Sequence, residues 1–328
     1  MSNPFTGLID LAQPRLGGEV VHATDDFFAD KARLIDPAEP VFIPGKYDDN
    51  GKWMDGWESR RKRVPGHDWA IVRLGAPGEI AGFEIDTRNF TGNYPPRASI
   101  EGCVSDAVIP AEDADWTPLV PIIDLNGNDR RWVACPAGGV WTHVRLSIFP
   151  DGGVARLRVY GRIHKDWTRV GDDAVIDLLA MENGGRGIIA NDEHFGRVEN
   201  LTAPGRGRDM GDGWETRRRR DPGHDWAILE LGHLGTIDEI IVDTAHFKGN
   251  YPDRCSIQAS AAATGSPEVI ARQAEAWPVL LPETKLQMDQ VHVVSDGIQP
   301  HGPIRFVRLN IYPDGGVSRL RLRGRLAY

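Results

Sequence analysis

One short stretch of this chain gathers most of the side chains that acid–base chemistry uses. Between Asp55 and Trp69 the sequence reads DGWESRRKRVPGHDW, with a carboxylate at Glu58, a run of cations, and His67 next to Asp68. Glu and His exchange protons readily when their surroundings adjust their pKa, and Arg binds a carboxylate through two parallel hydrogen bonds. The stretch returns as DGWETRRRRDPGHDW from Asp212 to Trp226, so the chain carries this chemical set twice.

The cationic run admits three interpretations. If the run is extended, Arg61 and Arg63 point to one face while Arg60 and Lys62 point to the other, and one pair could bind a ligand carboxylate. A solvated loop and a nucleic-acid patch are the alternatives. The net charge of −9 and the pI near 5.6 argue against nucleic acid and against an anionic membrane. A small molecule is the expected partner.

The Pro-Gly-His-Asp-Trp segment predicts a histidine at the rim of a tight turn. Asp68 could orient His67 for proton transfer, or both side chains could bond to the backbone of the turn. Trp69 begins an apolar strand and is expected to lie in the core. The same expectations hold for the second copy, at His224, Asp225 and Trp226.

A third repeated loop reads TRNFTGNYPPR from Thr87 to Arg97 and TAHFKGNYPDR from Thr244 to Arg254. Gly-Asn and Tyr-Pro favour turns, and Tyr and Arg could donate hydrogen bonds to a polar ligand. The carboxylates that precede these loops, Asp86 and Asp243, could pair with Arg97 and Arg254 respectively. A purely structural turn is the alternative.

No cofactor is expected from the sequence. A divalent metal held by Glu58, His67, Asp68 and Asp86 stays open as an alternative, although their spacing matches no known metal motif. The chain has no GxSxG motif, Walker loop or dinucleotide fingerprint, which leaves serine-nucleophile and phosphate-loop chemistry unsupported.

The elements that must position these residues are predicted to be strands in a duplicated domain. In the aligned segments 55–100 and 212–257, 28 of 46 positions are identical. We expect one repeat over 1–165 and a second over 166–328. A repeat that takes up half of the chain indicates a duplicated domain, because solenoid repeats are only about 20–50 residues long. Two short strands, 70–75 and 80–87, and a PDGG turn at 150–153 are predicted in the first copy, and one short helix is predicted at 174–181.

Composition indicates a globular protein with 41% hydrophobic residues. Three cysteines form no recognisable disulfide or zinc pattern, and no targeting segment or long apolar run occurs. A cytoplasmic location is therefore expected. With few helix signals, each copy is predicted to be an all-β jelly-roll sandwich that resembles the galactose-binding-like, discoidin-type fold.

The doubled motifs DGWESRR, PGHDW, GNYP and PDGGxxRLRxxG resemble the allantoicase family over nearly the whole chain. The resemblance implies a homo-oligomeric hydrolase that converts allantoate to ureidoglycolate and urea in purine degradation. On this interpretation the catalytic candidates are Glu58, His67, Asp68, Glu215, His224 and Asp225. The candidates for substrate binding are Trp57, Arg60, Arg61, Tyr94, Arg97, Trp214, Arg217, Arg218, Tyr251 and Arg254.

The two copies differ within the motifs, since Val64 and Pro96 correspond to Asp221 and Asp253. It follows that the copies need not be equally active. A tandem binding module for a small ligand or carbohydrate is the competing interpretation, because related sandwiches bind ligands through the same loops. A scaffold that builds oligomers from duplicated surfaces is a third, but it leaves the charged clusters without a purpose.

Overall fold

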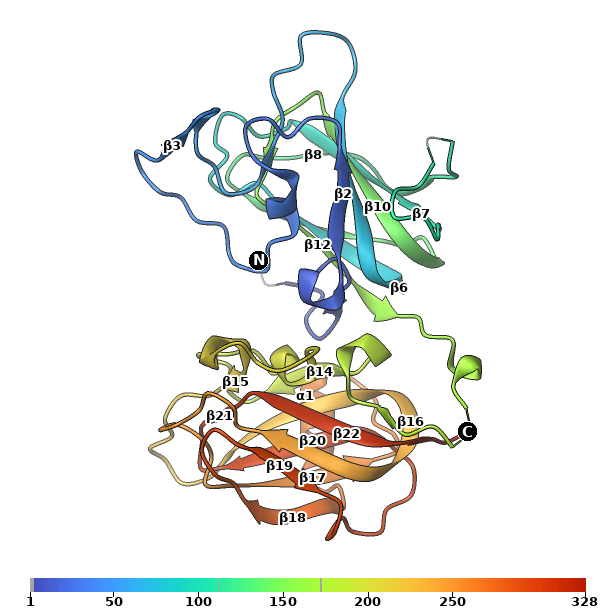
Figure 1. Ribbon diagram of the computed structural model, residues 1–328, viewed down its shortest axis with the longest axis vertical. Coiled ribbons are helices and arrows are strands. Elements are labelled where there is room, and N and C mark those ends of the chain that lie inside the picture. The colour runs from blue at the N-terminus through green and yellow to red at the C-terminus, as the bar shows by residue number, and fades with distance from the viewer. Residues whose placement is uncertain (1–2, 112, 172) are drawn as a thin grey trace. The chain divides into compact units, whose positions relative to one another are not determined.

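The structure is a computed structural model that describes residues 3–111, 113–171 and 173–328, and it divides into two compact units (Figure 1). Ile9–His164 belongs to the first unit, Lys165–Tyr328 belongs to the second, and the short segment Thr6–Leu8 groups with the second. No helix among the described residues is long and apolar enough to cross a membrane.

The described residues of the first unit form strands and two 3-10 helices (Figure 1). The 3-10 helices are Pro14–Leu16 and Lys31–Ile35. The strands are β1 (Ile9–Asp10), β2 (Glu19–Ala23), β3 (Tyr47–Asp48), β4 (Gly51–Lys52), β5 (Trp57–Glu58), β6 (Asp68–Asp86), β7 (Arg97–Cys103), β8 (Thr117–Asp124), β9 (Arg130–Ala134), β10 (Val140–Phe149), β11 (Gly153–Val154) and β12 (Arg156–Ile163).

The second unit repeats this order without a counterpart of the β3–β4 hairpin. Its strands are β13 (Ile176–Asp177), β14 (Arg186–Ala190), β15 (Trp214–Glu215), β16 (Asp225–Asp243), β17 (Arg254–Ser260), β18 (Val279–Lys285), β19 (Val291–Val294), β20 (Ile304–Tyr312), β21 (Gly316–Val317) and β22 (Arg319–Leu326). Its helices are α1 (Pro267–Ala274) and the 3-10 turns Trp167–Arg169, Met181–Asn183, Val198–Thr202 and Met210–Asp212.

One long strand joins the two layers of each sandwich. The first half of β6 pairs with β2 and β10, and its second half pairs with β9 and β12. The two short strands predicted at 70–75 and 80–87 are therefore one continuous strand, and Gly75 does not end it. In the second unit β16 does the same with β14 and β20, then β19 and β22. The predicted all-β jelly-roll sandwiches are confirmed.

The core of each unit lies between these layers. On β10 the apolar Val144, Leu146 and Ile148 are fully buried, while Arg145 and Ser147 alternate with them on the opposite face of the sheet. On β20 the residues Val307, Leu309 and Ile311 are buried in the same way. The opposite face carries polar side chains such as Arg145 on β10, while on β20 Phe306 packs there in a second apolar cluster with Ile270 of α1.

The helix predicted at 174–181 is wrong. Ile176–Asp177 is a strand, and only a 3-10 turn begins at Met181. The one α-helix among the described residues is α1, which starts at Pro267 after Ser266 and buries Ile270 and Ala274. Proline at the first helical position is a common start signal.

A buried ion pair fixes the turn that leads into each repeated block. Arg156 is 1% exposed, and its Nη2 donates to Asp55 Oδ2 at 2.9 Å. Arg319 and Asp212 make the same contact at 2.9 Å in the second unit. A buried charge of this kind requires its partner, so the pair specifies where the block begins.

Candidate active site

The repeated loops meet at one end of each sandwich. In the first unit, Ser59 N–H donates to Gly152 O at 3.1 Å, and Gly153 N–H donates to Asn93 O at 2.7 Å. These bonds join the ESRR, GNYP and PDGG blocks. In the second unit Thr216 binds Gly315 at 3.1 Å and Gly316 binds Asn250 at 2.8 Å in the same way. The residues that looked scattered in sequence are therefore neighbours.

Gly152 explains the PDGG sequence. Its φ is +141°, and a Cβ placed there would lie 2.7 Å from Pro95 N and 2.8 Å from Asn93 O. Gly315 has a φ of +135° and equally close contacts with the GNYP loop. Only glycine combines this backbone conformation with so close an approach. The peptide bonds before Pro150 and Pro313 are cis.

Glu58 lines a depression of about 330 Å³ in the first unit. Its Oε1 accepts a hydrogen bond from Asn93 Nδ2 at 2.7 Å. The depression is lined by Phe28, Lys52, Met54, Glu58, Asn89, Thr91, Gly92 and Asn93. A small polar molecule placed here would contact the Glu58 carboxyl directly.

Burial adjusts the ionisation of Glu58. The side chain is 9% exposed, and this loss of solvation raises the pKa of Glu58, while the Asn93 hydrogen bond and the charge of Lys52 act in the opposite direction. A carboxyl with a raised pKa holds or releases a proton nearer to neutral pH, as proton-transfer catalysis requires.

The second unit repeats the central contact. Asn250 Nδ2 donates to Glu215 Oε1, and desolvation again raises the pKa of Glu215. The surroundings differ, because Asn250 also lies 3.9 Å from the sulfur of Met210. His246 and Lys248 occupy the positions of Asn89 and Thr91. Both units thus contain the carboxyl–amide pair, but the side chains around the pair differ between them.

Lys52 belongs to an insertion that only the first unit carries. It ends the β3–β4 hairpin, where it pairs with Tyr47, and its Nζ lies 4.7 Å from the ring of Phe42. No ion pair involves Lys52 among the described residues. This side chain brings a cation to the depression beside Glu58.

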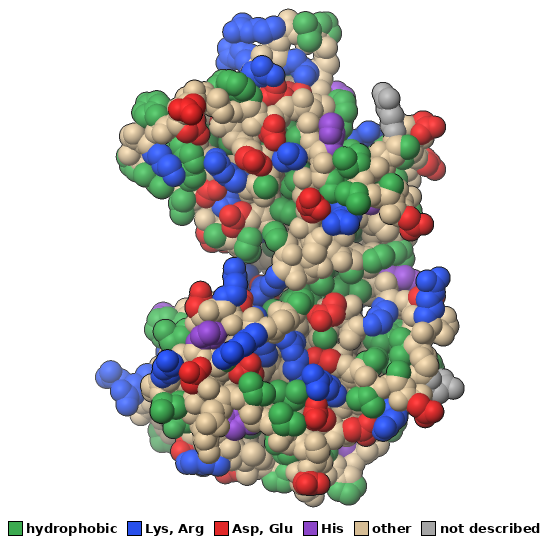
Figure 2. Space-filling model, in the orientation of Figure 1, with side chains coloured by type: hydrophobic (Ala, Val, Ile, Leu, Met, Phe, Trp, Pro, Cys, Tyr) green, Lys and Arg blue, Asp and Glu red, His purple; other side chains and the backbone are tan. Residues whose placement is uncertain are grey.

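The cationic side chains that were predicted to bind a ligand carboxylate lie in different settings. Arg60 is held by Asp25, with its Nε 2.7 Å from Oδ2, and Arg217 is held by Asp192 at 2.8 Å. Arg61 and Arg218 are exposed. Figure 2 shows Lys and Arg side chains gathered at the tip of the first unit, where the loop before β6 projects in Figure 1. This cationic tip lies on the surface rather than in the depression.

Asp68 does not contact His67 in the manner expected of an orienting carboxylate. Asp68 is 1% exposed, and its Oδ1 accepts from Lys62 Nζ at 2.6 Å and Thr24 Oγ1 at 2.8 Å. Asp225 is likewise bound by Arg219 and Asn191, each at 2.7 Å. These aspartates hold the cationic loop to the strand that follows it.

The histidines lie against aromatic rings. His67 packs 4.5 Å from Phe149, and burial lowers the pKa of His67. His224 packs 4.7 Å from Tyr312, its Nε2 lies 3.2 Å from Asn310 Oδ1, and burial likewise lowers its pKa. Neither histidine lines the depression beside Glu58. The structure therefore separates the glutamates from the histidines.

The burial of the repeated tryptophans differs from the expectation. Trp57 is fully buried and donates from Nε1 to Asp25 O at 2.8 Å, and Trp214 does the same with Asp192 at 2.9 Å. Trp57 and Trp214 therefore belong to the core. Trp69, which was expected in the core, is only partly buried, and so is Trp226.

The ion pairs expected across the GNYP loop do not form. Asp86 is fully buried and accepts from Arg88 rather than Arg97. Arg97 is exposed, while Arg254 contacts Glu283 at 2.6 Å and lies 5.1 Å from the Tyr312 ring. The tyrosines of this loop, Tyr94 and Tyr251, are partly buried and pack against apolar clusters.

The four residues of the alternative metal site have separate partners, namely Asn93 for Glu58, Phe149 for His67, Lys62 for Asp68 and Arg88 for Asp86. Over the described ranges, no group of three or more His, Cys, Asp or Glu side chains is arranged to hold a metal ion.

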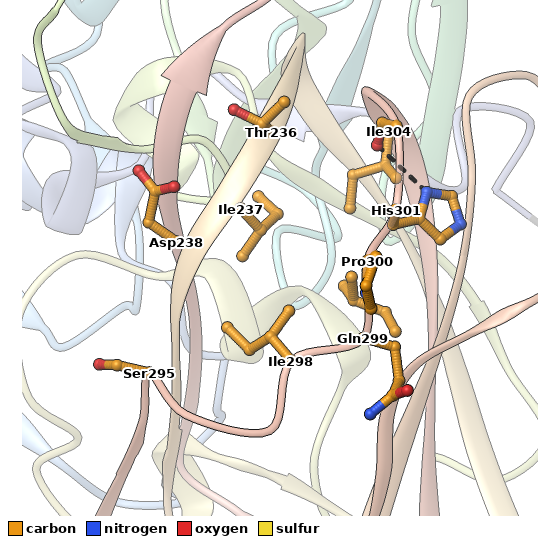
Figure 3. Close-up of a pocket in the computed structure, with 11 residues that line it drawn as sticks. Thr236, Ile237, Asp238, Ser295, Ile298, Gln299, Pro300, His301 and Ile304 are labelled. Carbon is orange, nitrogen blue, oxygen red and sulfur yellow. Dashed lines mark hydrogen bonds between the residues drawn. The ribbon is translucent and has the colours of Figure 1, made fainter.

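A second cavity, of about 400 Å³, lies at the bend of β16 in the second unit (Figure 3). Ile237 and Ile298 face each other across it, and His301 lies at its edge, with its Nδ1 3.1 Å from Gly302 O of the same loop. The segment 295–302 that forms one wall is not among the repeated blocks. The depression beside Glu58 is the better candidate because it is built from them.

Of the residues that line the depression, only Glu58 was predicted as a site residue, and the two that act on its pKa, Asn93 and Lys52, were missed. Asn93 was interpreted as a turn residue. The asparagine at the same position of both GNYP loops could have indicated a role in the site. Lys52 lies in a segment with no equivalent in the second copy, so the repeat offered no signal for it.

Comparison with known proteins is consistent across the whole chain. A family model described as the allantoicase repeat matches residues 9–164 and 176–327. The chain is 55% identical to probable allantoicase 2 of Burkholderia pseudomallei, covering 97% of this chain and 95% of that protein. It is 52% identical to a probable allantoicase of Pseudomonas fluorescens, covering 99% and 98%. The crystal structure of allantoicase from Saccharomyces cerevisiae superposes with a TM-score of 0.82 at 36% identity, covering 96% and 92%.

Proposed function

This chain belongs to the allantoicase family, and we propose that it hydrolyses allantoate to ureidoglycolate and urea at the depression beside Glu58 and at the equivalent position beside Glu215. The observation that carries this assignment is the hydrogen-bonded carboxyl–amide pair, Glu58 with Asn93 and Glu215 with Asn250, at the meeting point of the repeated loops.

The reaction needs a proton carrier next to the central carbon of allantoate. One ureido nitrogen must accept a proton as its bond to that carbon breaks and urea leaves. A water oxygen then bonds to the carbon, either directly or after an imine forms, and gives up a proton. Glu58, with its raised pKa, supplies the first proton and accepts the second. Glu215 does the same in the second unit.

The substrate also needs a cation for its carboxylate. In the first unit Lys52 lines the depression, and the exposed Arg61 and its counterpart Arg218 lie on the loop that follows each glutamate. Arg60 and Arg217 keep the rim in place through Asp25 and Asp192. Asn93 holds the Glu58 carboxyl and leaves its second oxygen to face the ligand.

The remaining candidates act around this centre. Asp68 and Asp225 position the cationic loops through Lys62 and Arg219. Tyr94 and Tyr251 pack beneath the GNYP loops, and Arg97 and Arg254 lie beyond them. An assembly of several copies and a cytoplasmic location, implied by the resemblance and by the composition, belong to the same proposal.

The direct test is to incubate the purified protein with allantoate and to measure urea and ureidoglycolate, both with a chelator and with added divalent metals. We expect urea and ureidoglycolate in equal amounts. If no urea forms under any of these conditions while allantoate still binds, the tandem binding module is the correct interpretation.

A further inference from the structure

The second unit contains a buried arginine that lacks a carboxylate partner. Arg308 on β20 is 6% exposed, and burial lowers its pKa. Its Nε donates to Asn310 Oδ1 at 2.9 Å, and its guanidinium lies 5.0 Å from the ring of Trp226. Within the part of the chain that the structure describes, no carboxylate oxygen lies within 4 Å of it.

In the first unit the equivalent arginine pairs with a carboxylate. Arg145, the equivalent of Arg308, lies on β10 and pairs with Glu101 on β7 at 2.7 Å. The position of Glu101 is taken by Gln258 in the second unit. Gln258 directs its amide nitrogen to Trp277 O at 2.9 Å, so it supplies no charge to Arg308. One substitution between the copies has therefore removed the internal anion.

The side chains around Arg308 form a polar floor on the outer face of the sheet. Asn310 and Ser256 are 3% and 7% exposed, and Asn310 Nδ2 donates to Ser256 Oγ at 3.2 Å. Ser256 Oγ lies 3.0 Å from Tyr312 Oη, and His224 Nε2 lies 3.2 Å from Asn310 Oδ1. His224 and Tyr312, which are half-buried, lie between this floor and the solvent.

Desolvating a guanidinium without an anion is costly, and a carboxylate that binds it regains much of that free energy. The planar guanidinium also suits a carboxylate better than it suits a spherical anion. Glu275 is the nearest acidic group that acts on Arg308, but it is exposed and makes no ion pair with it. The described part of the second unit therefore has no carboxylate that pairs with Arg308 as Glu101 pairs with Arg145.

We propose that Arg308, with His224 and Asn310, binds the carboxylate of a small ureido acid on the outer face of the second unit, at a site separate from the depression beside Glu215. The neighbouring hydroxyl groups of Ser256 and Tyr312 can exchange hydrogen bonds with the ureido group of such a molecule. This proposal concerns binding and does not require turnover.

The test uses N-carbamoylglycine, which carries one carboxylate and one ureido group, and measures its affinity and stoichiometry by titration calorimetry. Wild-type protein is compared with R308M and with Q258E, which restores the carboxylate that Glu101 supplies in the first unit. R145M is the matched control, because it removes an arginine whose partner is already present. The neutral amide, N-carbamoylglycinamide, is the control for the ligand's charge.

We expect R308M and Q258E to lose one bound N-carbamoylglycine per chain, or to weaken its binding at least about tenfold, while R145M retains it. The neutral amide should not occupy this site. Q258E keeps the test decisive if R308M fails to fold, because it recreates a pair that the first unit already tolerates. Unchanged binding in folded Q258E, or equal binding of the neutral amide, would overturn the proposal.

The result is independent of the catalytic assignment. If wild-type protein releases no urea from allantoate but Q258E still loses N-carbamoylglycine, only the catalytic proposal fails. If urea release is normal and Q258E binds like wild type, only the Arg308 site fails.

Discussion

At the scale of single residues, the hydrogen bond from Asn93 controls how readily Glu58 ionises. Burial raises the pKa of Glu58, and the amide N–H of Asn93 opposes this because it stabilises the ionised carboxylate. Asn250 has the same effect on Glu215. The balance of burial and hydrogen bonding therefore sets the pH range in which each glutamate can transfer protons.

Replacing both amides, in N93A/N250A, should raise the pKa of both glutamates further. The inflection of the kcat profile that reports their ionisation should move to higher pH by roughly 0.5–1 unit, the value of one hydrogen bond. The measurement is urea release from allantoate between pH 5 and 9, a range chosen to span about two units on either side of neutrality. The matched control is N126A, because Asn126 contacts Asp129 rather than either glutamate. An inflection that stays in place, or moves to lower pH, would contradict this role of Asn93.

The sequence could not show which of the candidate residues are buried. Trp57 and Trp69 have similar sequence settings, yet Trp57 is enclosed and Trp69 is not. Burial depends on which layer covers each face, and that information comes from distant strands. For the same reason the sequence could not show that Lys62 and Thr24 already bind Asp68.

At the scale of elements, the site depends on how closely the PDGG turn approaches the GNYP loop. Gly152 lies against the backbone of this loop, and Gly153 donates to Asn93 O. Asn93 is thus held from both sides, by the turn through its backbone and by Glu58 through its side chain. The repeated glycines therefore position the Glu58–Asn93 pair and its counterpart in the second unit.

G152A should destabilise the protein by about 1–3 kcal/mol, because its φ of +141° is strained for alanine and the new Cβ meets the loop backbone. It should also lower kcat by displacing Asn93. Chemical denaturation and urea release measure the two effects. G92A is the matched control for stability, since no atom lies within 4 Å of a Cβ placed at Gly92. Equal stability of G152A and G92A would show that the close approach is not required.

The duplicated sandwiches were predictable because the repeat, the turns and the scarcity of helix signals all point the same way. The continuity of β6 was not predictable, because Gly75 and Gly78 look like strand ends, yet here they allow a close approach of neighbouring backbone at the bend. The helix α1 had a recognisable start at Ser266 and Pro267, but it lies in a segment outside the repeated blocks.

At the scale of the whole molecule, duplication preserved the central pair and changed its surroundings. The differences noticed in sequence lie at the surface, where Val64 and Asp221 are exposed and Asp253 forms an ion pair with Lys285. The larger differences are the insertion that brings Lys52 to the first depression and the replacement of Glu101 by Gln258. The two units therefore share the carboxyl–amide pair and differ in the charged side chains around it.

The central claim is that the repeated glutamates transfer the protons in both units. The most direct measurement is the kcat for urea release from allantoate by the double variant E58Q/E215Q, with its thermal unfolding recorded to verify the fold. Removing both proton carriers should lower kcat at least about 100-fold. A folded double variant that releases urea at the wild-type rate would contradict the account.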